Sequence, residues 1–447
     1  MNYFYIAKIT IEMRSALKIG SGFSSGNSDS PIDVDANNLP IIRGSGIKGA
    51  IKSSEKIINL FENEKFNNLF GYSEKDSAKA GELTFGSARI LDEKGKACEG
   101  LIVDKSDFVK KLEIKRERQR NSMSDKRAVK KSAKFDEEIV MKGSRFQFFL
   151  TFETKNEDDA TWENVLSIFY DKHLSFGAGR TRGFGFFNIV SCEYKKFNPN
   201  KDEDLKNYLD FTYSLHDNLD EWNNFELEST ETQNDKYENY TIELEPEFYY
   251  QFGAGFGDNR VDSIAKEEDI VIYSDKDAKI ESYYMIPFSS IKGALSHRTA
   301  YKYNKLNKVF INEDDTDPDN IENNIGTNNA VKAIFGEEKD SALKKGAAGH
   351  IIGFDIYIDK DKVSVLKTDH NTISELEGGV VDSHLFSKSA ISSDFVLEIS
   401  VEKSALKEEE IKSAFELALK DLKSGYLLLG GKTSTGYGMF LEKAKND

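Results

Sequence analysis

The chain of 447 residues carries 77 acidic and 61 basic side chains, which gives a formal net charge of −16 at pH 7. No stretch approaches the roughly 18 uninterrupted apolar residues of a transmembrane helix, and the N-terminus lacks a secretory signal pattern, so we expect a cytoplasmic protein with no membrane partner. Cys98 and Cys192 lie far apart and outside any Cys/His cluster, which argues against a structural zinc site.

The first 196 residues predict one α+β domain. In chain order we expect a strand, a Gly/Ser-rich loop containing Asp29, a short strand, a helix, two further strands, a second helix and a last strand. These elements span Phe4–Arg14, Leu39–Ile42, Gly46–Phe61, Gly81–Leu91, Arg145–Glu153, Glu163–His173 and Phe184–Cys192. The order of strands and helices is that of ferredoxin-like or RRM-like domains.

The start of the first predicted helix has the features of a phosphate site. Ser45 is positioned to cap the helix, and Lys48 and Lys52 fall four residues apart on one face near its start. A helix N-terminus that bears lysines over a Gly-Ser turn favours anion binding. The alternative is a capped helix that only contacts solvent.

Basic residues are concentrated between positions 101 and 134. This segment holds twelve Lys and Arg side chains against five acidic ones, a local net charge of +7 in an acidic protein. A solvated charged helix is the ordinary interpretation of such a run. The concentration of one sign of charge favours the other interpretation, an arm that contacts a polyanion.

A Gly-rich turn precedes the last predicted strand of the first domain. The segment Gly177–Gly185 reads GAGRTRGFG, and its glycines let the backbone approach a ligand closely while presenting Arg180 and Arg182. It is not a Rossmann fingerprint, because the spacing differs and the turn leads into a strand instead of a helix.

The second half of the chain repeats motifs of the first half in the same order. This collinearity indicates a fused duplication, in which each copy is a domain with its own core. The pairs are Gly20–Phe23 with Gly253–Phe256, Asp29 with Asp262, Lys48 with Lys292, Asn121 with Asn371, and Gly183–Gly185 with Gly436–Gly438.

An acidic segment separates the two copies. Residues 200–238 hold twelve acidic side chains against three lysines, as expected of a solvated connection. The sequence therefore predicts a first domain at 1–196, an acidic linker at 197–238 and a second domain at 239–447.

The combined motifs resemble a known family. The segments LKIGSGFSSGNSDSPI, LPIIRGSGIKGAIKS, FDEEIV and FGAGRTRGFG occur in an order similar to that of RAMP (repeat-associated mysterious) proteins, most like the Cas-seven-type backbone subunits of type III CRISPR effectors. The second half is similar, and Asp369–Ile391 resembles the thumb segment of such subunits. A tandem fusion of two units is similar to subtype III-D variants.

The resemblance implies a fold and a set of roles. It implies two RRM-like (RAMP) domains that hold crRNA, each with a β-hairpin thumb, at about 113–138 and about 366–389. It also implies that Asp29 and Asp262 cut the target RNA and bind Mg²⁺ or another divalent cation. Asp262 lacks the following Pro and aliphatic residue that Asp29 has. The implied thumb residues are Asn121, Phe135, Asn371 and Phe386, and the expected RNA contacts are Ser45, Lys48, Lys52, Arg180, Arg182, Ser289, Lys292 and Lys432.

The implied function is that of a crRNA-guided, metal-dependent endoribonuclease in antiviral defence. Its partners would be crRNA, complementary target RNA, and other type III subunits: a large signalling subunit, a small subunit and further RAMP subunits. Two alternatives stay open. One is a structural crRNA-binding scaffold without cleavage activity. The other is a crRNA-processing endoribonuclease, against which the duplicated Asp loops without histidine count.

Overall fold

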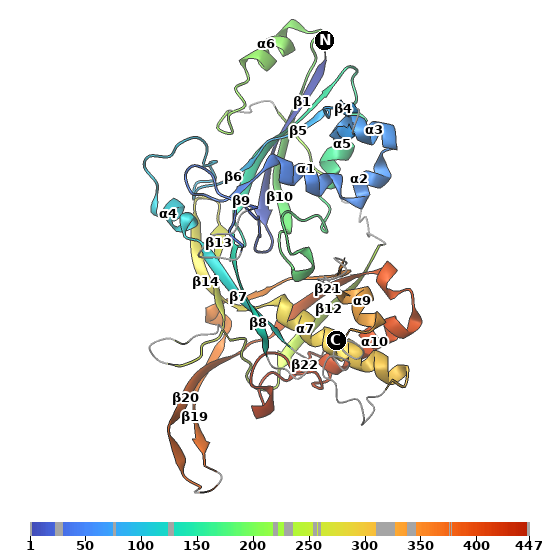
Figure 1. The fold of residues 1–447 in the computed structure, drawn as a ribbon. Coiled ribbons are helices and arrows are strands. Elements are labelled where there is room, and N and C mark those ends of the chain that lie inside the picture. Colours follow the sequence, from blue (N-terminus) through green and yellow to red (C-terminus); the bar gives the residue numbers. More distant parts are fainter. Residues whose placement is uncertain are drawn as a thin grey trace.

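The structure of the protein is a computed structural model, drawn in Figure 1. It describes residues 2–22, 30–74, 77–123, 129–217, 222–227, 236–253, 257, 261–309, 327–337, 346–374, 376 and 378–444. The predicted α+β class with two tandem ferredoxin-like domains and hairpin insertions is confirmed. Among the residues just given, no helix is both long and apolar enough to cross a membrane.

Domain 1 runs from the N-terminus through β11. Its elements are β1 (Tyr3–Met13), β2 (Ile41–Ile42), α1 (Gly44–Lys52), α2 (Glu55–Leu60), α3 (Asn63–Phe70), β3 (Tyr72–Glu74), β4 (Ser77–Lys79), β5 (Leu83–Phe85), β6 (Ala88–Ile90), α4 (Asp107–Glu113), β7 (Arg116–Met123), β8 (Val129–Ile139), β9 (Arg145–Thr154), α5 (Asp159–Ile168), a 3-10 turn (Arg180–Arg182), β10 (Phe187–Phe197), α6 (Asp202–Asp210) and β11 (Asn223–Asn224).

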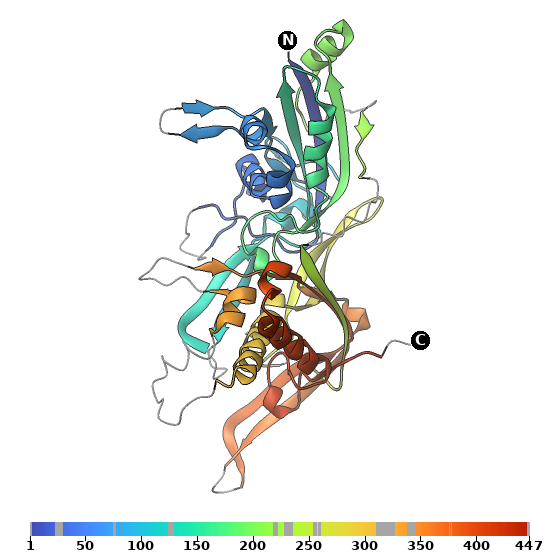
Figure 2. The same cartoon turned by 90° about the vertical axis from the view of Figure 1, so that its right-hand side faces the viewer.

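The sheet of domain 1 has the order β11-β10-β1-β9-β6-β2, with β5 also paired to β9. Strand β1 therefore lies between β10 and β9. These strands correspond to the first, the last and the third strand of a ferredoxin-like fold, which are arranged in the same way. Helices α1, α2, α3 and α5 cover one face of the sheet (Figure 2), and their buried residues, such as Ile47 and Trp162, join one apolar cluster with those of β1 and β9. Burial of this cluster supplies the main stabilisation of the domain.

One helix that we predicted for domain 1 is divided into two helices in the structure. We predicted a single helix over Gly46–Phe61, and the structure interrupts it between α1 and α2 at Ser53 and Ser54. Serine side chains compete for backbone hydrogen bonds and therefore favour helix ends. Ser53 donates from its hydroxyl to the Ala50 carbonyl at 3.0 Å, which is a bond of this kind.

The acidic segment after β10 packs on the other face of the sheet. Tyr208 of α6 stacks on Phe4 with ring centroids 4.1 Å apart, and Leu215 is buried beside Ile6 and Phe149. The acidic composition of the segment predicted a solvated connection, but a few apolar residues hold its described part against domain 1.

Domain 2 repeats the architecture. Its elements are β12 (Tyr237–Pro246), β13 (Glu267–Tyr273), β14 (Ala278–Ile286), α7 (Phe288–Leu306), α9 (Asn329–Phe335), β15 (Gly336–Glu337), β16 (Ala347–Ala348), β17 (Ile351–Gly353), β18 (Ile356–Ile358), a 3-10 turn (Lys360–Lys362), β19 (Ser364–Ile373), β20 (Val380–Ser392), β21 (Phe395–Glu402), a 3-10 turn (Lys403–Leu406), α10 (Glu409–Lys423), a 3-10 turn (Thr433–Thr435) and β22 (Phe440–Glu442).

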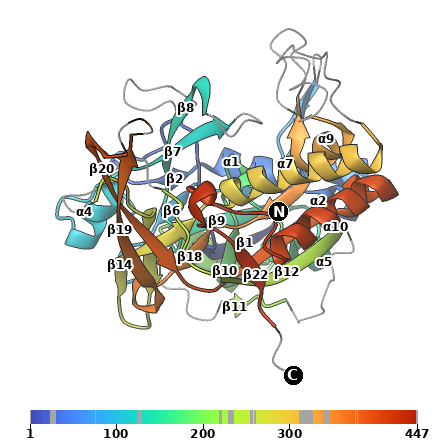
Figure 3. The same cartoon turned by 90° about the horizontal axis from the view of Figure 1, so that it is seen from below.

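The sheet order β17-β21-β12-β22 places the first strand between the third and the last, as in domain 1. Helices α7 and α10 lie side by side on one face of this sheet (Figure 3). Backbone pairs also recur at equivalent positions, which supports the duplication. They are Ile41–Arg89 and Met285–Tyr357, Gly20–Ile32 and Gly253–Ala265, and Ser30–Glu137 and Ser263–Lys388.

Each domain inserts a long β-hairpin at the position of the predicted thumb. The first hairpin (β7–β8) extends from domain 1 along domain 2, whereas the second hairpin (β19–β20) projects away from the rest of the chain (Figure 1). A further hairpin, β13–β14 of domain 2, extends in the opposite direction onto domain 1. There the Val271 amide donates to the Lys142 carbonyl at 2.8 Å, and the Tyr273 hydroxyl donates to the Leu91 carbonyl at 3.0 Å. Each domain therefore extends a hairpin onto the other domain.

Candidate nucleic-acid interface

The Asp262 loop is fixed to the second hairpin. The Ser387 amide and hydroxyl both donate to Asp262 Oδ2, at 2.7 and 3.0 Å, and the Asp262 amide donates back to the Ser387 carbonyl at 3.0 Å. Both Ser387 bonds end on one carboxylate oxygen, and the residue is exposed to solvent. The loop therefore presents an ordered carboxylate at the base of the hairpin.

Hydrogen bonds also set the charge of this group. The backbone N–H of Ser387, followed by its hydroxyl, lowers the pKa of Asp262 below its ordinary value, because both bonds stabilise the ionised form. Asp262 is an anion at neutral pH.

Asp29 lies outside the described residues, but the residues that follow it are described. Ser30 bridges in parallel to Glu137 on β8, just as Ser263 bridges to Lys388 on β20. The two loops therefore meet their hairpins at the same register.

The helix-start residues occupy exposed or partly exposed positions. Ser45 and its counterpart Ser289 are exposed in the first turns of α1 and α7. The predicted capping by Ser45 is wrong, because α1 begins at Gly44, two residues before the predicted start at Gly46, with Arg43 before it and no side-chain cap. Instead, the Gly44 amide donates to Ser87 Oγ at 3.2 Å.

The lysines of these helices have different surroundings. Lys48 is partly exposed, and Lys52 donates to the Gly71 carbonyl at 3.4 Å. Lys292, the counterpart of Lys48, donates to the Thr181 carbonyl of domain 1 at 3.2 Å. Burial, together with nearby Arg182, lowers the pKa of Lys292 to about 8. Lys292 therefore faces the domain boundary.

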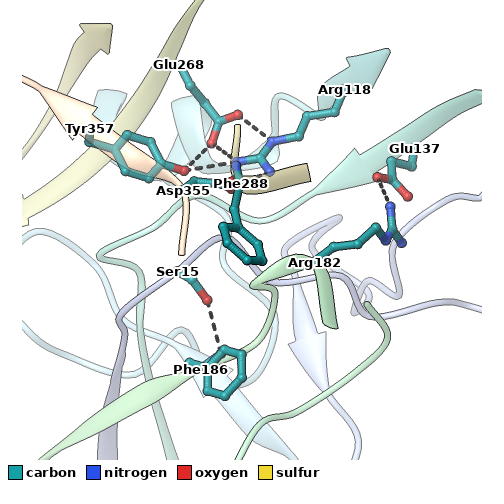
Figure 4. Close-up of polar contacts among 9 residues, drawn as sticks. All are labelled: Ser15, Arg118, Glu137, Arg182, Phe186, Glu268, Phe288, Asp355 and Tyr357. Carbon is teal, nitrogen blue, oxygen red and sulfur yellow. Dashed lines mark hydrogen bonds and ion pairs between the residues drawn. The ribbon is translucent and has the colours of Figure 1, made fainter. Parts of the chain in front are cut away.

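The Gly-rich turn of domain 1 also faces domain 2. Arg180 donates to the Tyr237 hydroxyl at 2.7 Å, and Arg182 donates to Glu137 at 2.7 Å (Figure 4). A Cβ on Gly183 would lie 2.3 Å from the Gly353 carbonyl oxygen, so the turn approaches protein backbone closely. Both arginines thus have partners within the chain, and Arg180 keeps about a third of its side chain exposed.

The predicted thumb residues lie on the two hairpins. Phe135 on β8 and Phe386 on β20 are both partly open to solvent, with 42% and 39% of their surfaces exposed. Asn371 is exposed on β19, where it pairs with Leu385. Asn121 belongs to β7, but its side chain lies outside the described part of the structure.

Comparison with known proteins identifies the fold family. The sequence pattern of the RAMP superfamily matches residues 10–188 and, separately, 252–440. The chain belongs to the RAMP superfamily. It carries two RAMP units in tandem, as the resemblance implied.

Two individual relatives are more distant. The CRISPR system Cmr endoribonuclease Cmr4 of Pyrococcus furiosus is 36% identical over 74 residues, which is 16% of this chain and 25% of that protein. The match thus spans about a quarter of the curated relative. A chain of a type III-B Cmr-beta structure in the apo state aligns with a TM-score of 0.33 and 14% identity, over 41% of this chain and 96% of that chain.

An ion cluster that sequence reasoning missed joins the two RAMP units. Arg118, on the first hairpin, donates to Glu268 and Asp355 of domain 2 and to the Tyr357 hydroxyl (Figure 4). Burial alone would raise the pKa of Glu268, but Arg118, with smaller contributions from Tyr357 and Lys266, outweighs burial and lowers the pKa. Asp355 in turn accepts the Phe288 amide at 2.8 Å, at the start of α7. Arg118 gave no separate signal because it belongs to the basic run of 101–134.

Proposed function

We propose that this RAMP protein is a crRNA-binding backbone subunit of a type III CRISPR effector complex, and that it cleaves complementary target RNA once per domain. Asp29 and Asp262 would be the catalytic residues. The names of the relatives support the class of complex, and the duplicated loops support two cutting sites.

The observation that carries the proposal is the ordered, ionised Asp262 carboxylate at the base of a projecting hairpin. RNA is cut when its 2′-hydroxyl oxygen attacks the adjacent phosphorus and the 5′-oxygen leaves, which yields a 2′,3′-cyclic phosphate and a 5′-hydroxyl end. The protein must hold the strand in line and assist a proton transfer. A single exposed carboxylate meets the second requirement.

The donor set is compatible with Mg²⁺ held jointly by protein and RNA. In the described residues, no three His, Cys, Asp or Glu side chains gather into a metal cage. Mg²⁺ commonly takes one or two carboxylates together with substrate phosphates. Asp262 supplies one carboxylate, and both Ser387 bonds end on its Oδ2 and leave Oδ1 to other partners. When bound, the ion would stabilise negative charge that develops on the phosphate.

The hairpins support the proposal that other subunits are partners. The first hairpin is tied to domain 2 by Arg116 and Arg118, and the second exposes apolar residues, including Ile373, Leu376 and Leu385. Exposed apolar surface of this kind marks contact sites. We place the neighbouring RAMP subunit and the guide–target duplex there.

The test is a gel of end-labelled target RNA incubated with the assembled complex. Asp29→Ala should abolish one product and Asp262→Ala the other, with target affinity nearly unchanged. EDTA should stop both cuts. Asp104→Ala, which removes another exposed loop aspartate, is the matched control and should cut at both positions.

The outcomes separate the alternatives. If each aspartate variant cuts at every wild-type position, the protein is a scaffold and the cleavage proposal is wrong. If the cuts fall in the guide instead of the target, the protein is a processing enzyme.

A further inference from the structure

Domain 2 contacts the first hairpin through an acidic pocket. Glu268 and Asp355 accept hydrogen bonds from the guanidinium of Arg118 (Figure 4). The Tyr357 hydroxyl accepts a third, at 3.0 Å. Both carboxylates are buried, and a side chain without positive charge would leave them uncompensated. The pocket is therefore selective for a cation.

Domain 1 has a pocket at the corresponding position. The strand pairs that recur in the two domains align Arg89 with Tyr357. The first amide of helix α1 donates to Ser87 and that of helix α7 donates to Asp355, which aligns these two residues. In domain 1 a hydroxyl thus replaces one carboxylate, and a guanidinium replaces the phenol.

The acid that remains in this pocket already has its partners. Asp35 stands at the position of Glu268, since each accepts a hydrogen bond from its aligned neighbour, at 3.2 and 2.6 Å. The carboxylate of Asp35 also accepts the Asn37 and Leu39 amides, at 2.8 and 3.0 Å. Within the described residues, the side chain of Arg89 makes no other polar contact. The pocket, with a volume of about 360 Å³, therefore favours a carboxylate over a cation.

An apolar rim adjoins this pocket. Gly100, which lines the pocket, accepts from the Asn37 side chain at 2.7 Å, and the Ile102 amide donates to the same side chain at 2.9 Å. These bonds fix a loop on which Leu101 and Val103 are 78% and 85% exposed. Apolar side chains held in solvent beside a polar pocket favour a protein partner over a small anion.

The second hairpin of this chain does not supply the carboxylate. On the first hairpin, Arg118 lies opposite Glu137. On the second hairpin, Thr368 lies opposite Lys388, the counterpart of Glu137. Thr368 therefore stands at the position of Arg118, and its hydroxyl is 3.0 Å from His370 Nε2. A second copy of the chain would bring no charged group to the pocket of domain 1.

A second contact between the domains is also not repeated. Arg14 of domain 1 donates to Glu398 of domain 2 at 2.9 Å. The register of β5 with β9 and of β17 with β21 aligns Phe149 with Glu398. Phe149 is packed against Phe211, with ring centroids 5.4 Å apart, and the counterpart of Arg14 in domain 2 is Glu247. Two copies of the chain therefore lack both contacts that join its own domains.

We propose that the pocket of Asp35, Ser87 and Arg89, with its rim of Leu101 and Val103, docks a protein subunit that presents a carboxylate to Arg89. A second copy of this chain is not that subunit, so the protein enters an assembly as a single copy between two unlike neighbours. The inference rests on the proposed function for the existence of the assembly. It adds the chemistry of the partner that domain 1 selects.

The test uses the full chain with Thr368 exchanged as the probe, in sedimentation velocity over the micromolar range. Wild-type protein and Thr368→Arg should stay monomeric. Thr368→Glu should associate end to end, because its carboxylate meets Arg89. Thr368→Gln is the matched neutral control, and the dissociation constant of Thr368→Glu should be about tenfold to a hundredfold lower, the strength of a charge-assisted hydrogen bond.

Second-site changes locate the contact. Arg89→Gln in the Thr368→Glu background should restore the monomer. Leu101→Ser with Val103→Ser should weaken the association while keeping the wild-type urea midpoint, since both side chains are largely exposed. Lys279→Gln removes an exposed lysine elsewhere and should leave the association unchanged.

Three outcomes would overturn the proposal. Wild-type protein that self-associates as tightly as Thr368→Glu would make a second copy the occupant. Equal dissociation constants for Thr368→Glu and Thr368→Gln would show that the pocket does not select a carboxylate. Association that survives Arg89→Gln would place the contact elsewhere. No RNA is present in these measurements, so they can fail while the target-cleavage gel supports the proposed function, and the gel can fail while they succeed.

Discussion

Arg118 of domain 1 and Glu268 of domain 2 form a bidentate ion pair, with Arg118 Nε 2.6 Å from Glu268 Oε2 and Nη2 2.6 Å from Oε1. Both side chains are buried, and Asp355 completes the cluster at 2.7 Å. Because Asp355 also binds the Phe288 amide, the first hairpin is tied to the start of helix α7. The cluster therefore links the first hairpin of domain 1 to the core of domain 2.

Replacing Arg118 by methionine should destabilise the protein strongly. Two carboxylates would be left buried without their cation, which typically costs about 3–5 kcal/mol. The measurement is the free energy of unfolding in urea. Arg116→Met is the matched control on the same strand. Its acidic partner Asp269 is more exposed, and its other acceptors are the Lys111 and Ile114 carbonyls, so no carboxylate is left buried and the loss should be clearly smaller. Equal losses in the two variants would mean that the Arg118 cluster does not hold the domains.

Gly143→Ala should open the domain boundary. A Cβ at Gly143 would lie 1.8 Å from the carbonyl oxygen of Val271, on the β13–β14 hairpin of domain 2, and the φ of 81° is left-handed. Gly95→Ala separates the two effects, since Gly95 has a φ of 74° but open space around it. We expect Gly95→Ala to lose about 1–2 kcal/mol of unfolding free energy and Gly143→Ala clearly more. Limited proteolysis should detect the freed hairpin only in Gly143→Ala.

Lys292 should make stability depend on alkaline pH. Its pKa is lowered to about 8 in the folded protein, because burial and Arg182 disfavour the ammonium, against roughly 10.4 in the unfolded chain. Between these values the unfolded state binds more protons, so the stability of the wild type rises with pH. The Lys292→Met variant lacks this titrating group in both the folded and the unfolded state. Its stability relative to the wild type should therefore fall by about 1–3 kcal/mol from pH 7 to pH 10. Parallel unfolding curves would show that Lys292 is solvated in the folded state.

Motif repetition was enough to predict the duplication, because a duplicated fold repeats its loops and turns at matching positions. The paired loops followed from this spacing, the ferredoxin-like class from the order of predicted strands and helices, and the two hairpins from the family resemblance. The partners of individual side chains could not be predicted in this way. Arg118 meets acids that lie 150 and 237 residues away, and nothing local distinguishes it from Arg116 or Arg120. Likewise, only the fold shows that Lys388 lies beside Lys432 and occupies the position in domain 2 that Glu137 has in domain 1.

Ser387→Ala should separate the orientation of Asp262 from its charge. The variant keeps the backbone N–H that is the main cause of the lowered pKa. It loses the two hydroxyl bonds, in which Ser387 Oγ donates to Asp262 Oδ2 at 3.0 Å and accepts from the Asp262 amide at 3.2 Å. In a carboxyl ¹³C NMR titration, we expect the pKa of Asp262 to rise part of the way to its ordinary value of about 3.9. Because the folded pKa lies below the unfolded one, ionised Asp262 favours folding above that range and stops doing so as the pH falls through it.

The same variant should slow the proposed cut at the domain 2 position. A carboxylate with one fewer hydrogen bond samples more orientations, and misplacement of a reacting group lowers the rate without changing affinity. The domain 1 product in the same lane serves as the internal control and should form at the wild-type rate. Ser263→Ala is the matched variant, since Ser263 Oγ accepts from Gln251 at 3.0 Å instead of holding the carboxylate. If Ser387→Ala and Ser263→Ala cut both positions at equal rates, the Ser387 hydroxyl has no part in orienting Asp262.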